Sequence, residues 1–180
     1  KKTTKDMLFL KQVAPSLGYA QYPVNDGKMV NKGIEFSLTA HIIKTNDVNF
    51  DIRLNGGHYI NKMTQMPIDD TTGKEKPLEI QGGYGWSKGH SLYDFYMREY
   101  AGVDPETGMA LYNAYYNVKA DGTKDLITDM VTYQQKNKIE KLEVEKTSNY
   151  NDATKKYVDK SGIPALQGGF GFDFAVKGFE

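Results

Sequence analysis

The sequence predicts an all-β protein built from antiparallel strands. In several segments apolar and polar residues alternate with a period of two, which is the pattern of strands with one apolar and one polar face. Glycine, proline, asparagine and aspartate separate these segments, as turn residues do. No segment approaches the roughly 18 consecutive apolar residues that a membrane-spanning helix needs.

Composition narrows the classes of function. The 180 residues include 23 basic and 23 acidic side chains, so the formal net charge is zero and a nucleic-acid partner is not expected. The absence of cysteine excludes thiol catalysis, thiolate metal sites and disulfides in this sequence. A mean hydropathy of −0.61 suits a soluble domain. It also suits strands of an outer-membrane barrel, because these are only half apolar.

The clearest strand pair lies between Ile34 and Asn61. Its first strand carries apolar residues at every second position: Ile34, Phe36, Leu38, Ala40 and Ile42. After the turn residues Thr45, Asn46 and Asp47, the alternation resumes at Phe50, Ile52 and Leu54. A tight hairpin is therefore predicted, with one apolar and one charged face.

The register of the hairpin can be inferred from its apolar and polar faces, because a slip by one residue would place apolar side chains opposite polar ones. The apolar face then pairs Leu38 with Leu54, Ala40 with Ile52 and Ile42 with Phe50. The polar face pairs His41 with Asp51 and Thr39 with Arg53. The same register places His58 on the apolar face near Ile34.

The middle of the chain contains turn-rich and aromatic segments. Residues 63–76 are polar and predict a loop, and a glycine-rich segment follows at Gly82–Trp86. Leu92–Tyr100 is rich in aromatic residues and predicts a strand. Asp104–Gly108 has the proline and glycine of a tight turn and leads into Ala110–Tyr112, so a second hairpin is expected.

Asn117–Gly162 differs from the rest. It is hydrophilic and rich in lysine and glutamate, and it predicts a long polar excursion with one short helix near Lys136–Lys146. A last strand is predicted where Phe170, Phe172 and Phe174 alternate with small or polar residues. No internal repeat or linker indicates a second domain.

The sequence contains no recognisable catalytic or metal-binding pattern. The sequence has no G-x-S-x-G elbow, and His41, His58 and His90 lack the spacing of metal ligands. Asp69–Gly73 resembles the start of a calcium loop, but the later glutamate is out of register. We therefore expect no enzyme activity, no catalytic residue, no metal site and no cofactor, and the ligand-binding residues stay unknown.

Strand alternation alone leaves two architectures open, since a soluble β-sandwich and a membrane barrel both alternate. A barrel would place tyrosines near strand ends as an aromatic girdle, for which the candidates are Tyr59, Tyr93, Tyr100 and Tyr112. A soluble sandwich would act as a glycan-binding module through exposed aromatic residues such as Trp86 and Tyr84.

Four local strings in order resemble the barrel region of SusC/RagA-like TonB-linked outer-membrane proteins. The first is Val13–Gly18 followed by Val30–Glu35, and the second runs from Asn49–Ile52 to Tyr59–Lys62. The third is Tyr93–Tyr96 with Tyr100–Gly108. The fourth joins Tyr157, Lys160–Ser161, Ile163–Pro164, Gly168–Gly171 and Lys177–Phe179. Together they span almost the whole chain.

This resemblance implies that residues 1–180 are part of a large transmembrane β-barrel of antiparallel strands with long polar extracellular loops. It implies import of oligosaccharides or peptides across the outer membrane of a Bacteroidetes-type bacterium. The expected partners are a SusD-like surface lipoprotein, the lipid bilayer and, through parts outside this sequence, the TonB–ExbB–ExbD complex.

We also expect the sequence to be a piece of a longer chain. No signal peptide, plug domain or TonB box is visible in it. A 22-stranded barrel needs on the order of 200–240 residues in strands alone, which exceeds the length of this sequence. The resemblance therefore implies that residues 1–180 form a single domain, which is part of a TonB-dependent receptor barrel.

Overall fold

The computed structural model describes residues 1–18 and 20–177. Its strands are β1 (Lys2–Lys5), β2 (Leu8–Gln12), β3 (Gln21–Asn25), β4 (Lys28–Lys44), β5 (Val48–Gln65), β6 (Glu79–Gln81), β7 (Tyr84–Trp86), β8 (Asp94–Arg98), β9 (Tyr100–Val103), β10 (Ala110–Val118), β11 (Lys124–Ile127), β12 (Lys141–Thr147), β13 (Lys155–Ser161) and β14 (Gln167–Val176). The helices are the 3-10 turn η1 (Pro15–Leu17) and α1 (Met130–Lys136). The all-β prediction is therefore confirmed. No helix in these residues is long and apolar enough to cross a membrane.

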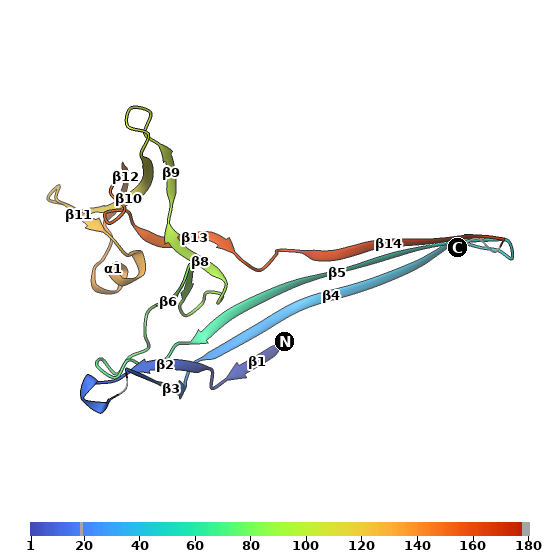
Figure 1. The fold of residues 1–180 in the computed structure, drawn as a ribbon, viewed down its shortest axis with the longest axis horizontal. Coiled ribbons are helices and arrows are strands. Elements are labelled where there is room, and N and C mark those ends of the chain that lie inside the picture. The colour runs from blue at the N-terminus through green and yellow to red at the C-terminus, as the bar shows by residue number, and fades with distance from the viewer. Residues whose placement is uncertain (19, 178–180) are drawn as a thin grey trace.

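One long sheet, which we call the strand arm, has the strand order β1-β4-β5-β14. Its neighbouring strands are antiparallel. Figure 1 shows β4, β5 and β14 running side by side, with β1 beside the start of β4 and the far end of the three long strands extending beyond the other strands. The three-residue turn Thr45–Asp47 joins β4 to β5 at the far end of the arm. The backbone N–H of Thr45 donates to Val48 O at 2.9 Å across this turn.

Two large excursions leave the arm at the end opposite this turn. The first excursion, residues 6–27, joins β1 to β4 and contains the β2–β3 hairpin. The second excursion, residues 66–166, joins β5 to β14 and contains all strands from β6 to β13. The chain therefore alternates between a short connection at one end of the arm and long connections at the other.

The predicted hairpin register is confirmed over most of its length. Leu38 pairs with Leu54 and Ala40 with Ile52, and on the other face His41 pairs with Asp51. The predicted pair of Ile42 with Phe50 is wrong, because a bulge between His41 and Ile43 puts Ile43 opposite Phe50. An extra residue near a strand end bends the ladder and leaves one residue unpaired.

The second excursion is more structured than the sequence predicted. It contains one sheet of order β13-β8-β7-β6 and another of order β11-β10-β12, with β9 also paired to β10. The expected second hairpin is confirmed as β9–β10 across the Asp104–Gly108 turn, in which Asp104 Oδ2 accepts from Thr107 Oγ1 at 2.6 Å. This hairpin lies in the excursion and not in the strand arm (Figure 1).

Three predicted boundaries are wrong. The helix spans Met130–Lys136, and most of the expected helix at Lys136–Lys146 is strand β12 instead. In β12, Leu142 and Val144 alternate with glutamates, which is a strand pattern. Strand β5 continues to Gln65 into the predicted loop, and the predicted strand Leu92–Tyr100 is divided into β8 and β9.

A small apolar core lies where both excursions meet the end of β5. Phe9 from β2 packs with Met63 from β5 and with Met66, and all three side chains are at least 96% buried. Trp86 and Leu92 of the second excursion pack against them. The core thus joins the two excursions to each other and to the strand arm.

Candidate functional site

The apolar face of the strand arm is exposed in the described structure. Ile34, Phe170 and Phe172 have exposed fractions of 75%, 69% and 64%. Neighbouring members of this face are also exposed: Phe36, Leu38, Leu54 and Phe174. A contiguous apolar surface of this kind on one face of a long sheet indicates contact with another apolar phase or partner.

The length of this face follows from strand geometry. From Ile34 to Ile43 the strand advances by about 30 Å at about 3.3 Å per residue. A strand segment of this length at the tilt of about 40° found in outer-membrane barrels would span about 23 Å along the barrel axis, close to the roughly 25 Å apolar band of such barrels.

The opposite face of the arm is polar and cross-linked between strands. His41 Nδ1 lies 2.7 Å from Asp51 Oδ1, and Arg53 donates to Asp173 Oδ1 at 2.6 Å. Tyr59 donates its hydroxyl proton to Glu35 Oε1 at 2.6 Å. These contacts join β4, β5 and β14, so the polar face helps to hold the strand register that the apolar face also requires.

The four tyrosines named as candidates for an aromatic girdle do not gather on the apolar face of the strand arm. Tyr59 belongs to the arm but lies on its polar face, because side chains alternate along a strand and Tyr59 is out of phase with Ile60. Tyr93, Tyr100 and Tyr112 belong to the second excursion. Proximity to a strand end in the sequence therefore does not place a tyrosine on the apolar face of the arm.

Glycines let aromatic rings lie flat on the arm. A Cβ atom on Gly33 would lie 2.6 Å from the Tyr59 ring, and one on Gly57 would lie 3.0 Å from the Tyr59 hydroxyl. On the apolar face, a Cβ on Gly56 would lie 2.6 Å from the Phe36 ring. Any larger residue at these positions would displace the ring that covers it, which explains glycine in a strand interior.

The second excursion is anchored to the free edge of β5. Strand β14 begins at Gln167 opposite Gly57, so it does not pair with the end of β5 beyond that point. Segment Gly89–Leu92 takes this place: Gly89 N–H donates to Met63 O, and Met63 N–H donates to His90 O, both at 2.8 Å.

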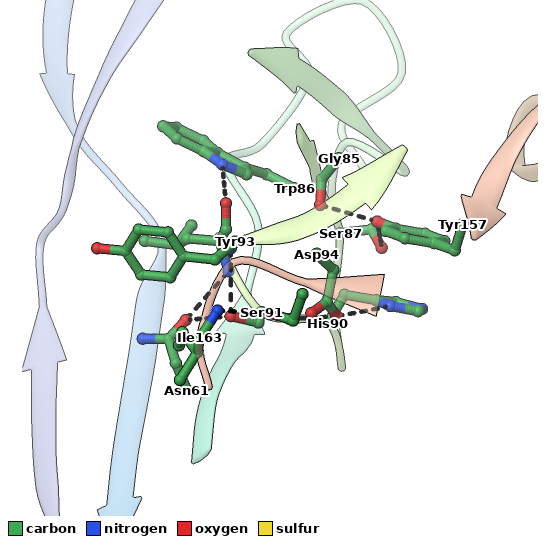
Figure 2. A network of polar contacts seen from close by, with 12 residues as sticks. Asn61, Gly85, Trp86, Ser87, His90, Ser91, Tyr93, Asp94, Tyr157 and Ile163 are labelled. Atoms are coloured by element: carbon green, nitrogen blue, oxygen red, sulfur yellow. Dashed lines mark hydrogen bonds and ion pairs between the residues drawn. The ribbon is translucent and has the colours of Figure 1, made fainter. Parts of the chain in front are cut away.

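Asn61 is the centre of this junction (Figure 2). Its side chain is buried, and its amide nitrogen donates to Asn31 Oδ1 at 2.6 Å. Its amide oxygen accepts from Ser91 Oγ at 3.1 Å and from Leu92 N–H at 3.0 Å. One side chain thus satisfies groups from β4 and from the second excursion, which fixes their relative position.

His90 and Tyr157 extend the network into the second excursion (Figure 2). Their rings are stacked with centroids 3.6 Å apart, and His90 Nδ1 lies 3.3 Å from Asp94 Oδ2. Tyr157 donates to Gly85 O at 3.0 Å, and its hydroxyl lies 2.6 Å from Ser87 Oγ. Burial raises the pKa of the Tyr157 hydroxyl, so it stays a neutral donor.

This cluster contains serine, histidine and aspartate but is not arranged as a catalytic triad. Within residues 1–18 and 20–177, Ser87 Oγ is bonded to Tyr157 and Ser91 Oγ to Asn61, and no serine hydroxyl is bonded to His90. A triad needs a nucleophile hydrogen-bonded to the base. The geometry therefore supports a role in fixing structure.

The other two histidines lie where the sequence predicted. His41 is on the polar face beside Asp51, and His58 is on the apolar face opposite Ile34. His58 Nδ1 contacts the backbone oxygen of Ala165, just before β14. The structure does not bring the three histidines together, and no group of metal-ligating side chains occurs in the described part of the chain.

Helix α1 is held against the second excursion by Asp129 and Tyr96. Asp129 caps the helix by accepting from Thr132 N–H at 2.9 Å. Buried Tyr96 donates its hydroxyl proton to the same carboxylate at 3.0 Å. Burial is the largest cause that raises the pKa of Tyr96, so this hydroxyl remains protonated.

The outer surface of the second excursion carries paired charges. Lys124 on β11 lies 2.9 Å from Glu143 and 2.8 Å from Glu145 on β12. Hydrogen bonds from Lys141 and Lys124 lower the pKa of Glu143 to about 2. These contacts are exposed and support the sheet only weakly.

The aromatic residues of the glycan-binding alternative are engaged inside the protein. Trp86 is partly buried, donates its indole N–H to Leu92 O at 3.0 Å and packs edge-on against Phe9. Tyr84 is also partly buried and stacks on Phe95. Neither ring offers the open flat face that sugar binding needs.

Solved structures of one transport system share this fold. The chain matches one of the "closed-closed" RagAB peptide importer with a TM-score of 0.68 and 28% identity, over 98% of this chain and 17% of that chain. A RagAB peptide transporter gives 0.66 and 29%, over 98% and 17%. The "open-open" RagAB importer gives 0.68 and 26%, over 98% and 16%.

No protein-family model and no curated protein matches the sequence. Gly178 and Phe179, which form the end of the fourth resembling string, lie outside the described residues. The solved structures support the resemblance over almost all of this sequence, although it covers only about one sixth of their chains. Residues 1–180 are therefore similar in fold to part of a chain of a peptide importer, and no enzyme is among these relatives.

Proposed function

We propose that residues 1–180 form part of the wall and extracellular loops of the outer-membrane β-barrel of a SusC/RagA-type TonB-dependent importer. The strand arm carries this proposal, because it combines an exposed apolar face of bilayer height with a polar opposite face. Outer-membrane barrels have short periplasmic turns and longer extracellular loops. The Thr45–Asp47 turn then lies in the periplasm, and both excursions lie outside the cell.

The proposed activity is uptake of peptides or oligosaccharides without covalent chemistry. Similarity to the RagAB peptide importer favours peptides. Substrate would bind between the barrel and a lid, and energised displacement of a plug would open the pore. The polar face with His41, Arg53 and Asp173 would line the interior of the barrel.

Three partners follow from this function. A SusD-like surface lipoprotein would form the lid above the two excursions. The TonB–ExbB–ExbD complex would supply energy through parts of the protein outside residues 1–180. Lipid would cover the apolar face that Ile34, Leu38 and Phe172 expose. A soluble sandwich is less well supported, because within the described residues no second sheet covers this face.

Cysteine labelling in intact cells tests the topology. Residues 1–180 contain no cysteine, so single substitutions can be read individually against the unsubstituted chain. A membrane-impermeant maleimide should label Glu106→Cys in the second excursion directly and Asn46→Cys in the turn only after the outer membrane is permeabilised. Leu38→Cys should stay unlabelled in both conditions. Equal labelling of Asn46→Cys and Glu106→Cys in intact cells would overturn the proposal.

A further inference from the structure

We propose that three lysines at the outer edge of the apolar face bind the phosphorylated headgroup of an outer-leaflet lipid. This inference rests on the proposed function, which places the apolar face against the bilayer. Lys1, Lys32 and Lys62 line a recess of about 390 Å³ together with Val30, Ile60 and Thr64. The lining thus combines three lysines with apolar residues.

Strand register places two of the lysines on the same face as the apolar side chains. Lys32 pairs with Ile60, and Lys62 pairs with Val30 on the neighbouring strand. Because side chains alternate along a strand, Lys32 shares its face with Ile34, two residues further along. The amino groups therefore continue the apolar face and do not belong to the polar one.

The charges of these lysines are not neutralised by acidic neighbours. All three residues are exposed, and none takes part in the ion pairs found in residues 1–18 and 20–177. Lysines elsewhere, such as Lys124 and Lys156, have glutamate partners. Three lysines without acidic partners around one recess favour binding of an anion.

The position of the recess favours an anion that is part of a lipid. Lys32 is about 7 Å along the strand from Ile34, which puts its amino group at the level of lipid headgroups. At the turn end the same face finishes with Val48 and Val176, without lysine. The basic cluster therefore marks only the end of the apolar face nearest the excursions.

A second recess further along the same face suits an acyl chain. Its large apolar lining residues are Phe36, Leu54, Leu166 and Phe170, and the rest of the lining is Asn55, Gly56, Gln167, Gly168 and Gly169. Its lining residue Gly56 lies about 20 Å along β5 from Lys62, a distance comparable to an extended acyl chain. A lipid whose phosphate contacts the lysines can thus place a chain on this surface, whereas free phosphate can occupy only the first recess.

Native mass spectrometry of the complete transporter chain in detergent tests this site. The probe is a short-chain phosphatidic acid, with phosphatidylcholine of the same chains as the neutral comparison. The variant Lys32→Gln with Lys62→Gln keeps the aliphatic stems and removes two charges. Affinity for phosphatidic acid should fall about 30-fold, since each lysine near a lipid surface contributes about a factor of five. The matched control is Lys136→Gln with Lys138→Gln in the second excursion, which should bind like the parent.

Each alternative result contradicts the proposal in a different way. Equal affinity of the Lys32 and Lys62 variant and the parent would show that these lysines do not bind the headgroup. Displacement of phosphatidic acid by inorganic phosphate at equal concentration would identify a free-phosphate site. Extraction of the parent chain from membranes by alkaline carbonate would instead refute the proposed function, so the two failures are distinguishable.

Discussion

The strand arm and the second excursion place their apolar and charged side chains in opposite ways. The arm exposes large apolar side chains such as Phe172 on one face and hydrogen-bonded charges on the other. The excursion buries Tyr96, Ala114 and Ile127 and places its charged pairs outside. One chain therefore contains a sheet with an exposed apolar face and an excursion with buried apolar side chains and exposed charges.

The buried polar groups show a second difference between the two regions. In the excursion, Thr154 is fully buried and its hydroxyl both accepts from Tyr115 N–H and donates to Ile127 O. In the described residues no buried side-chain polar atom lacks a hydrogen-bond partner. The excursion is thus internally satisfied, whereas the apolar face of the arm still needs a partner.

The largest expected effect comes from a charge on the apolar face. On the proposed function, Leu38→Arg places an arginine against lipid in the middle of the bilayer and should destabilise the barrel by about 2–4 kcal/mol. Urea titration of the complete chain in lipid vesicles measures this loss. Ser37→Arg, one residue away on the polar face, is the matched control and should cost far less. Equal losses for both variants would mean that the two faces meet the same environment.

A second variant breaks the junction between arm and excursion. Asn61→Leu leaves Leu92 N–H and Ser91 Oγ without their acceptor, a cost of roughly 2 kcal/mol. Hydrogen exchange at the Leu92 amide should therefore accelerate about 30-fold. Asn151→Leu replaces an exposed asparagine of the same excursion and should leave this amide unchanged. An unchanged rate in Asn61→Leu would show that the excursion is held elsewhere.

Two glycines of β14 give a smaller, local test of the arm. A Cβ on Gly168 would collide with the backbone oxygen of Asn55 and lie 3.1 Å from Gly56 Cα. Gly168→Ala should therefore cost about 1–3 kcal/mol in the same urea titration. A Cβ on Gly171 meets nothing within 4 Å, so Gly171→Ala is the control. A neutral Gly168→Ala would mean that β14 can separate from β5 without loss.

The smallest expected effect is on the exposed charges of the excursion. The pKa of Glu143, about 2, lies below its ordinary value of 4.5. Its stabilising contribution is therefore fully present above pH 4.5 and is lost as the pH falls toward 2. Lys124→Gln should raise the pKa of Glu143, measured by NMR of its carboxyl carbon. Lys119→Gln, which removes a partner of Asp125, should not change it.

Sequence reasoning works best where one face dominates the pattern. The alternation at Ile34, Phe36 and Leu38 predicted the hairpin and nearly all its register, because a slip would reverse every face. The bulge at His41–Ile43 was not predictable, because Ile42 and Ile43 are both apolar and either could face Phe50. Strand β12 could have been found from the alternation of Leu142 and Val144.

The junction and the proposed lysine site differ in how well the sequence predicts contacts between distant residues. Asn61 bonds to Ser91 and Asn31, each 30 residues away, and no local pattern marks such a contact. Lys32 and Lys62, in contrast, follow from the predicted register, since that register places them on one face. Lys1 joins them only through the pairing of β1 with β4.

The most direct test of the two-faced arm is a spin-label scan along β4 in the complete chain reconstituted in lipid. Single cysteines replace Phe36, Ser37, Leu38 and Thr39 in turn, and each nitroxide is probed with oxygen and with a water-soluble nickel chelate. We predict that the labels at positions 36 and 38 are most accessible to oxygen and those at 37 and 39 to the chelate. Equal accessibility of all four labels to the chelate would contradict a lipid-facing strand.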